Sequence, residues 1–332
     1  MKALKLSLFL LVFGFLTGCE QVFIEKDPPN TPEKNFDVLW TTLKERYSFF
    51  AYKHIDWDSV YAVYRPRVTP QTTERELWNL MSDMLDVLRD GHVNLRSEFD
   101  LYYYNWYIDA PANFDRHLLD KSYWRDTERT GRMVNTLLKN GTVGYIYYGS
   151  FIQPITDAQL DYLADKFAGA QGVIIDIRNN EGGNPINGFR LGRRLADQRR
   201  HVYTTLYKNG PGPNDFTAPD EAYLEPSGKP LPKKVVILTN RTVYSAANFF
   251  TAMMKAFPGV TVVGDRTGGG GGSPVGWELP NGWSFNFSSS ITYLPDGFII
   301  ENGVEPDLRV DQTEEDRLRG RDTLLERALS LF

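Results

Sequence analysis

The sequence has one cysteine, four histidines and no excess of positive charge. The single cysteine, Cys19, excludes an intrachain disulfide and a metal site built from several thiolates. The net charge is −5 and the Lys and Arg residues form no long runs, so nothing indicates nucleic acid as a partner. The chain contains 42% hydrophobic and 24% charged residues over 332 positions. This composition is typical of a globular protein with a sizeable core, and the length allows one large domain and one small one.

The N-terminus has the layout of a signal peptide. Lys2 and Lys5 precede an apolar run from Leu6 to Leu16, which is too short to span a bilayer as a helix. The segment 16–19, Leu-Thr-Gly-Cys, resembles the lipobox of bacterial lipoproteins, whose cysteine is lipidated and becomes the first mature residue. The alternative is an ordinary secretory signal with a coincidental cysteine.

The lipobox resemblance implies three features of the N-terminal region. Residues 1–18 would be a lipoprotein signal peptide, and Cys19 would carry a lipid that anchors the protein to a membrane. The location would then be the cell envelope, in the periplasm or at the outer membrane. Residues 19–34 are polar and rich in proline, which predicts a tether between the lipid and the fold.

The rest of the chain divides into a helical part and an α/β part. Residues 35–96 contain apolar residues at helical spacing, with capping residues offered by the segments 56–58 and 72–74, and predict a small N-terminal helical domain. Residues 97–332 alternate short apolar runs with helical patterns, which predicts an α/β domain with a mostly parallel sheet flanked by helices. The aromatic stretch 102–107 either packs in the core or lines a groove for an extended ligand.

The α/β pattern has recognisable elements. Continuous apolar runs indicate buried strands, and periodic segments indicate helices between them. Alternation of polar and apolar residues near the C-terminus indicates antiparallel strands, followed by a charged closing helix. The expected strands are 143–148, 172–177, 235–238, 260–263 and material in 283–293, and the expected helices are 158–167, 188–196, 246–257 and 313–331.

Ser245 is the first candidate for chemistry. It follows a predicted buried strand and lies at the start of a predicted helix, where free backbone N–H groups and the helix dipole favour a developing negative charge. On this segment alone, the simpler interpretation is a helix N-cap. A second segment, the loop 176–184, contains Gly182 and Gly183 after another buried strand. Such a loop is either a tight turn or one half of an oxyanion hole.

The remaining candidates are one histidine and two glutamates. His92 follows Gly91 where the helical region meets the α/β region, and clefts often form at such a seam. Glu301 and Glu305 lie in a loop that also contains Gly303. A carboxylate in this loop either orients a histidine or caps a turn.

Taken together and in this order, these segments resemble the S41 peptidases, the family of C-terminal processing and tricorn-type proteases. The matching blocks are 90–92, 143–151, 176–183, 245–271 and 303–307. Two departures point to the tricorn-like branch. First, the C-terminal processing (tail-specific) members use a Ser-Lys dyad, and the position of that lysine is occupied by Gly270 here. Second, those members carry a PDZ domain, and residues 97–140 are too few to hold one.

The resemblance implies a serine peptidase that acts on a peptide or protein through an acyl-enzyme, without a metal or an organic cofactor. Ser245 would be the nucleophile and His92 its base, with Glu301, or alternatively Glu305, orienting the imidazole. The N–H groups of Ala246 and of Gly182 or Gly183 would form the oxyanion hole. The competing hypotheses are an inactive S41-like lipoprotein that binds a peptide or other ligand, and an esterase or amidase.

Overall fold

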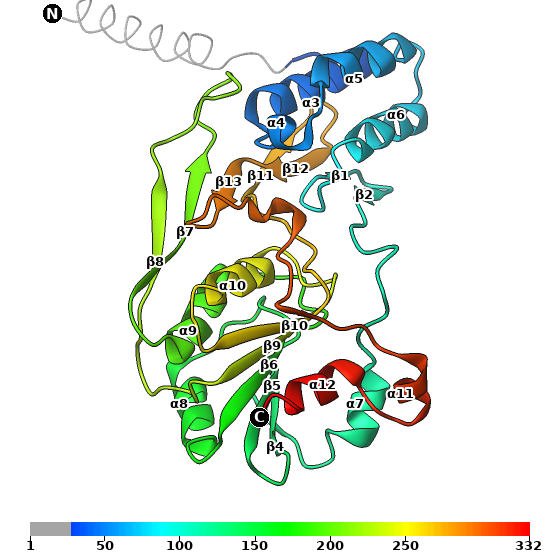
Figure 1. Cartoon of the computed structure of the whole chain (residues 1–332). Coiled ribbons are helices and arrows are strands. Elements are labelled where there is room, and N and C mark those ends of the chain that lie inside the picture. The colour runs from blue at the N-terminus through cyan, green and yellow to red at the C-terminus, as the bar shows by residue number, and fades with distance from the viewer. Residues whose placement is uncertain (1–27) are drawn as a thin grey trace, which may run out of the picture.

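The computed structural model describes residues 28–332 (Figure 1). The predicted signal peptide and the lipidation site Cys19 lie outside the described residues. Within residues 28–332, none of the helices combines the length and the hydropathy that a bilayer crossing needs. The predicted tether, residues 19–34, extends too far, because helix α3 already begins at Pro32. Thr31 caps this helix by accepting a hydrogen bond from the Lys34 N–H, and Pro32 suits the first helical turn.

The N-terminal region is helical, as the sequence predicts. Asp56 caps α5 through two backbone N–H groups, and Thr73 forms a capping box with Glu76 at the start of α6. Each of the two segments predicted to offer a cap, 56–58 and 72–74, therefore contains one. The elements are α3 (Pro32–Arg46), α4 (Phe50–Lys53), α5 (Trp57–Tyr64), the 3₁₀ helix η1 (Arg65–Arg67) and α6 (Glu74–Asp86).

A four-stranded antiparallel sheet completes the core of these helices. Its order is β11-β12-β1-β2, with β1 (Asn94–Arg96), β2 (Leu101–Tyr103), β11 (Pro274–Glu278) and β12 (Ser284–Ser288). Phe285 and Phe287 alternate along β12 and are buried with Phe36 and Met81. Residues from both sides of the predicted boundary at 96/97 thus share one core, and Figure 1 shows β11 and β12 beside the N-terminal helices. The division into two domains remains a prediction.

The main sheet has seven strands in the order β14-β10-β9-β6-β5-β4-β3. Pairing is parallel from β14 to β5 and antiparallel from β5 to β3. This confirms the predicted, mostly parallel sheet. The strands are β3 (Glu128–Thr130), β4 (Met133–Leu138), β5 (Val143–Tyr147), β6 (Gly172–Asp176), β9 (Val235–Thr239), β10 (Val260–Gly264) and β14 (Leu308–Arg309).

Helices cover both faces of this sheet. Along β6, Val173 and Ile175 belong to a core shared with residues of α8, α9 and α10, whereas Ile174 belongs to a core shared with residues of α7 and α12. Strands buried on both faces explain the continuous apolar runs in the sequence. The helices are α7 (Arg116–Ser122), α8 (Asp157–Lys166), α9 (Pro185–Leu195), α10 (Ala246–Met254) and α12 (Thr323–Leu329).

One predicted element of the C-terminal third is wrong. Residues 313–331 form two helices, α11 (Glu314–Leu318) and α12, so the prediction of a single closing helix is wrong. Gly320 has a φ of 71°, which ends the first helix, and Asp322 caps the second. A separate antiparallel sheet has the order β13-β7-β8, and the 3₁₀ helix η2 (Ile300–Asn302) follows it in the chain. Its strands are β7 (Arg200–Tyr207), β8 (Asp220–Leu224) and β13 (Ser290–Tyr293).

Candidate active site

Ser245 occupies a sharp turn between strand β9 and helix α10. Its φ is 50° and its ψ is −125°, a conformation that residues other than glycine rarely adopt. The hydroxyl makes no capping hydrogen bond to the helix. Instead its Oγ lies 3.0 Å from Nε2 of His92. The simpler N-cap interpretation is therefore wrong for this side chain, and two sequence-predicted residues 153 positions apart meet in space.

The turn at Ser245 is held by the backbone on both sides. The Ser245 N–H donates to the Gly269 carbonyl at 2.9 Å, and the Tyr244 N–H donates to the Asn180 carbonyl at 3.1 Å. Gly182 passes so close that a Cβ on it would lie 2.9 Å from the Cβ of Ser245. Its φ of 101° also favours glycine. Two loops that the sequence separates thus fix the conformation of the candidate nucleophile.

His92 is positioned by the carboxylate of Asp90. Asp90 Oδ1 accepts hydrogen bonds from the His92 backbone N–H at 2.8 Å and from the Tyr244 hydroxyl at 3.3 Å. Its Oδ2 accepts the Ser288 hydroxyl at 2.8 Å. Asp90 therefore connects the histidine loop, the residue before Ser245 and strand β12. Among the described residues, His92 Nδ1 is buried and has no hydrogen-bond partner.

The electrostatic environment lowers the pKa values of both His92 and Asp90. Burial lowers the pKa of His92, the Asp90 carboxylate raises it and the Lys53 ammonium lowers it, with a net decrease. Burial by itself would raise the pKa of Asp90, but Lys53, His92 and the hydrogen bonds outweigh it and hold that pKa below its usual value. A neutral imidazole that faces a serine hydroxyl can accept its proton near neutral pH.

Backbone N–H groups beside Ser245 distinguish the two glycines of the predicted oxyanion hole. The Gly182 N–H already donates to Asn180 Oδ1 at 2.9 Å. Within residues 28–332, no acceptor is recorded for the N–H groups of Gly183 and Ala246. Gly183, Ser245 and Ala246 all line one cavity of about 300 Å³. Gly183 and Ala246 are therefore the donors available to a ligand in this cavity.

Glu301 is buried, but it does not bond to the imidazole. Its Oε1 forms an ion pair with Lys53 Nζ at 2.7 Å, and its Oε2 accepts the Gly271 N–H at 2.9 Å. The Lys53 ammonium also donates to the carbonyls of Leu88 and Arg89 at 3.1 and 3.0 Å, so all three of its N–H groups are bonded. Helix α4 thus supplies a cation behind the histidine loop.

Burial raises the pKa of Glu301 to about 8, and Asp90 adds to this rise while Lys53 opposes it. The alternative carboxylate, Glu305, is 69% exposed and lies 3.7 Å from the guanidinium of Arg266. The hydrogen bonds of the described residues connect neither glutamate to the His92 ring. The role of either glutamate as the orienting residue remains a prediction.

Gly270 stands where the dyad lysine of tail-specific relatives is expected. Its φ is 77°, and a Cβ there would lie 2.6 Å from the Tyr244 ring. A longer side chain at this position would have to displace Tyr244, the residue that precedes the candidate nucleophile. The space for a lysine is therefore filled by an aromatic ring.

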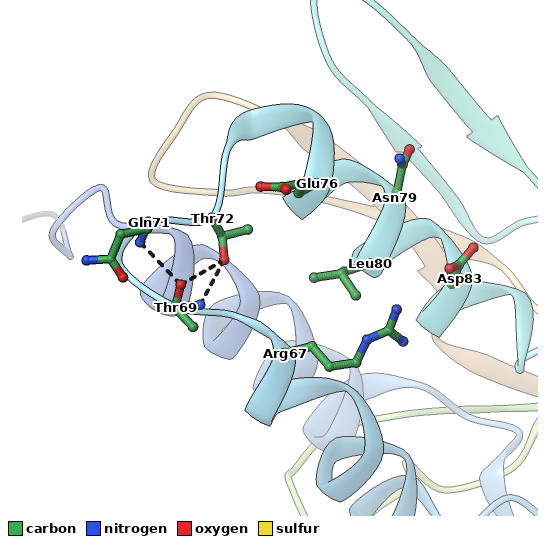
Figure 2. Close-up of a pocket in the computed structure, with 8 residues that line it drawn as sticks. All are labelled: Arg67, Thr69, Gln71, Thr72, Glu76, Asn79, Leu80 and Asp83. Carbon is green, nitrogen blue, oxygen red and sulfur yellow. Dashed lines mark hydrogen bonds between the residues drawn. The ribbon is translucent and has the colours of Figure 1, made fainter.

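A second cavity lies in the helical region and is lined by different residues from the cavity beside Ser245. The walls of the first come from α10, β7, β8 and the glycine loop, and include Phe249, Tyr203 and Ala222. The second, of about 550 Å³, lies between η1 and α6 (Figure 2). There the carboxylate of Glu76 accepts the Thr73 hydroxyl and N–H in the helix cap. The residues lining this second cavity include neither Ser245 nor His92.

Several residues that shape the site are not evident from sequence patterns. Lys53 lies in a four-residue helix, and Asn180 resembles any polar turn residue. Asp90 belongs to the same short block as His92, and this adjacency is the one signal that points to it. Within the described part of the chain, no group of three or more His, Cys, Asp or Glu side chains is placed to hold a metal ion.

The comparisons with sequence families agree with the geometry. A profile described as peptidase family S41 matches residues 142–310, and one described as the tricorn protease C1 domain matches residues 28–86. The carboxy-terminal processing protease CtpA of Bacillus subtilis is 26% identical over 198 residues, which are 58% of this chain and 40% of CtpA. A tricorn protease homolog of Saccharolobus solfataricus is 26% identical over 221 residues, which are 65% of this chain and 19% of the homolog. The chain therefore spans less than half the length of these curated relatives.

Solved structures extend the likeness to the whole fold. The crystal structure of a candidate peptidase from Parabacteroides merdae is 41% identical, with a TM-score of 0.88, and the match covers 91% of this chain and 97% of that one. The structure of mature CPAF is 12% identical with a TM-score of 0.66, over 90% of this chain and 95% of that one. At that identity, the likeness to CPAF concerns the fold alone.

Proposed function

Because the chain belongs to peptidase family S41, we propose that it is a serine peptidase with Ser245 as its nucleophile and His92 as its base. The observation that carries the proposal is the 3.0 Å distance between Ser245 Oγ and His92 Nε2. Hydrogen-bond reach between nucleophile and base is the geometry that activates a serine hydroxyl. The free N–H groups of Gly183 and Ala246 in the same cavity support the assignment.

In this proposal, hydrolysis proceeds through an acyl-enzyme. His92 takes the Ser245 proton as Oγ attacks the scissile carbonyl carbon, and the N–H groups of Gly183 and Ala246 stabilise the oxyanion. The C–N bond then breaks, and the leaving amine receives the proton from His92. A water molecule repeats the sequence, giving its proton to His92, and releases the acid product and free Ser245.

The imidazolium formed in these steps needs a negative charge nearby. Asp90 is supported in this role by its hydrogen bond to the His92 backbone and by its effect on the pKa of His92. We retain Glu301 as the predicted carboxylate behind the histidine. Its ion pair with Lys53 and its bond to Gly271 support a part in holding the glycine loop against the Ser245 turn.

A fluorophosphonate probe tests the proposal directly, because it reacts with activated serine hydroxyls. We expect labelling of the wild-type chain and none of Ser245→Ala or His92→Ala. Ser273→Ala is the matched control, because Ser273 lines the same cavity and its hydroxyl is not part of the pair. Labelling that persists in Ser245→Ala would refute the nucleophile. Absence of labelling in the wild type would favour the inactive, ligand-binding alternative.

The substrate class and the location belong to the same proposal. We infer that the chain cleaves proteins or peptides of the cell envelope and that it does so without using a PDZ domain. We also infer that a lipid on Cys19 holds it in the envelope. Hydrolysis of a peptide library, compared with simple esters, separates a peptidase from an esterase. Incorporation of labelled palmitate into the wild type but not into Cys19→Ala tests the anchor, and equal incorporation would contradict it.

A further inference from the structure

A third cavity, which is polar, lies close to the candidate catalytic pair but is distinct from the Ser245 cavity. Its volume is about 450 Å³, within the range of roughly 300–1,000 Å³ that is usual for ligand sites. Gly91 and Tyr244 line it, and each immediately precedes a residue of the pair. The two cavities share no lining residue. The proposed peptidase activity therefore gives no role to this polar cavity.

Positive charge dominates the lining of this cavity. Its cationic side chains are Lys53, Arg89, Arg241 and Arg266, and Glu301 is the one acidic residue among those that line it. Glu301 is already committed to Lys53 and to a backbone N–H, so it does not neutralise the arginines. The whole chain has a net charge of −5, which makes this local excess of cations unusual for the molecule.

The three arginines differ in burial and in their partners: Arg89 is exposed, Arg266 is about a third exposed, and Arg241 is more buried. Among residues 28–332, the structure records no hydrogen-bond or ion-pair partner for the Arg89 side chain. Arg241 donates one bond to Asp265 at 3.2 Å, but its Nε is buried without an acceptor. Arg266 donates to the Asn302 carbonyl at 2.6 Å and otherwise faces the exposed Glu305. A buried donor without an acceptor is costly, so a bound acceptor would relieve that cost at Arg241 Nε, while the more exposed Arg89 and Arg266 have donors that a ligand can reach.

Aromatic residues form the rest of the wall. Trp106 stacks on Tyr244 with ring centroids 3.9 Å apart, and its indole N–H donates to the Arg241 carbonyl at 3.2 Å. Tyr104 and Tyr52 also line the cavity. Apolar ring faces beside guanidinium groups suit a ligand with an organic body and several anionic groups. A single inorganic anion would leave most of the volume unfilled.

We propose that this cavity binds a small organic molecule with two or more oxyanion groups, either carboxylates or phosphates. Arg89 and Arg266 bind separate oxyanion groups, and Arg241 Nε supplies a further donor. The organic body lies against Trp106. The site is independent of peptide hydrolysis, so binding persists in Ser245→Ala.

Isothermal titration of the purified chain tests the site with four probes: citrate, fructose 1,6-bisphosphate, inorganic phosphate and uncharged sorbitol. Citrate and the bisphosphate distinguish carboxylate from phosphate ligands. We expect at least one of these two to bind, and Arg89→Ala/Arg266→Ala to weaken its affinity about tenfold or more, because charge-assisted hydrogen bonds are lost. Arg319→Ala is the control, since Arg319 is exposed and pairs with Glu315 elsewhere.

Two further measurements make the outcome decisive. Arg266→Lys keeps the charge but loses the planar fork, so its affinity should fall between those of the wild type and the double variant. Circular dichroism of each variant verifies folding. The proposal is overturned if neither organic anion binds better than sorbitol, or if the double variant binds as the wild type does. Inorganic phosphate that binds as tightly as the organic anions would also overturn it.

Discussion

The strained backbone at Ser245 leads us to predict that a glycine variant is more stable than an alanine variant at this position. Both Ser245→Gly and Ser245→Ala remove the hydroxyl and its 3.0 Å contact with His92 Nε2, so both should be inactive. They differ in the backbone, because alanine must keep the φ of 50° and ψ of −125° whereas glycine adopts these angles freely. The difference between the two variants therefore isolates the strain.

The expected magnitude follows from two opposing effects. A residue other than glycine in such a conformation costs about 1–3 kcal/mol. Glycine loses more conformational entropy on folding than alanine, which costs about 0.5–1 kcal/mol. We therefore expect Ser245→Gly to be more stable than Ser245→Ala by about 1 kcal/mol. Without strain the sign would be reversed.

Urea unfolding of the two variants measures this difference. The matched control is the pair Ser273→Gly and Ser273→Ala, because Ser273 lines the same cavity but has no positive φ. At position 273 we expect the alanine variant to be the more stable one. If alanine is also favoured at position 245, the turn is not strained and the argument from its conformation fails.

Further predictions concern the charges and the glycine loop. Burial raises the pKa of Glu301 to about 8 from a usual value of 4.5, so its contribution to stability is full below pH 4.5 and is lost as the pH rises through 8. Lys53→Met should lower the free energy of unfolding by about 3–5 kcal/mol, because it removes one partner of a buried ion pair. Urea unfolding should show a larger loss at pH 9 than at pH 6. Equal losses at the two pH values would contradict the ion pair. The pH dependence of fluorophosphonate labelling should have an acid limb set by the pKa of His92, which Lys53 lowers and Asp90 raises. Lys53→Met should therefore move this limb to higher pH, and Asp90→Asn should move it to lower pH. Shifts of both variants in the same direction would be inconsistent with the assignment. Gly182→Ala should reduce the labelling rate at least tenfold, because its Cβ would crowd the Ser245 turn. An unchanged rate would show that the turn tolerates displacement.

The main sheet could be predicted from sequence because its strands are buried on both faces. The predicted strand 172–177 is a nearly continuous apolar run, and the structure confirms it as β6, Gly172–Asp176. The sheet β11-β12-β1-β2 could not be predicted, because β1 and β2 contain three residues each and β1 pairs with β12, a strand far along the chain. Its pairing depends on contacts that local periodicity does not record.

The same distinction applies to the site. Ser245 and His92 belong to blocks with a family resemblance, and the structure brings them together. Lys53 belongs to no such block, because an isolated lysine in a short helix has no local signal. Its importance follows from a buried contact with Glu301, and their side chains are 8% and 2% exposed. Long-range ion pairs of this kind depend on the complete fold.

The glycines around Tyr244 bear on the choice of histidine as the proposed base. A Cβ on Gly270 would lie 2.6 Å from the Tyr244 ring, and one on Gly91 would lie 2.4 Å from Trp106. Tyr244 and Trp106 stack in the space that side chains at these two positions would need. A lysine base at position 270 is therefore excluded by packing as well as by sequence. In the proposed mechanism the base therefore approaches Ser245 from another direction, where His92, held by Asp90, lies at hydrogen-bonding distance.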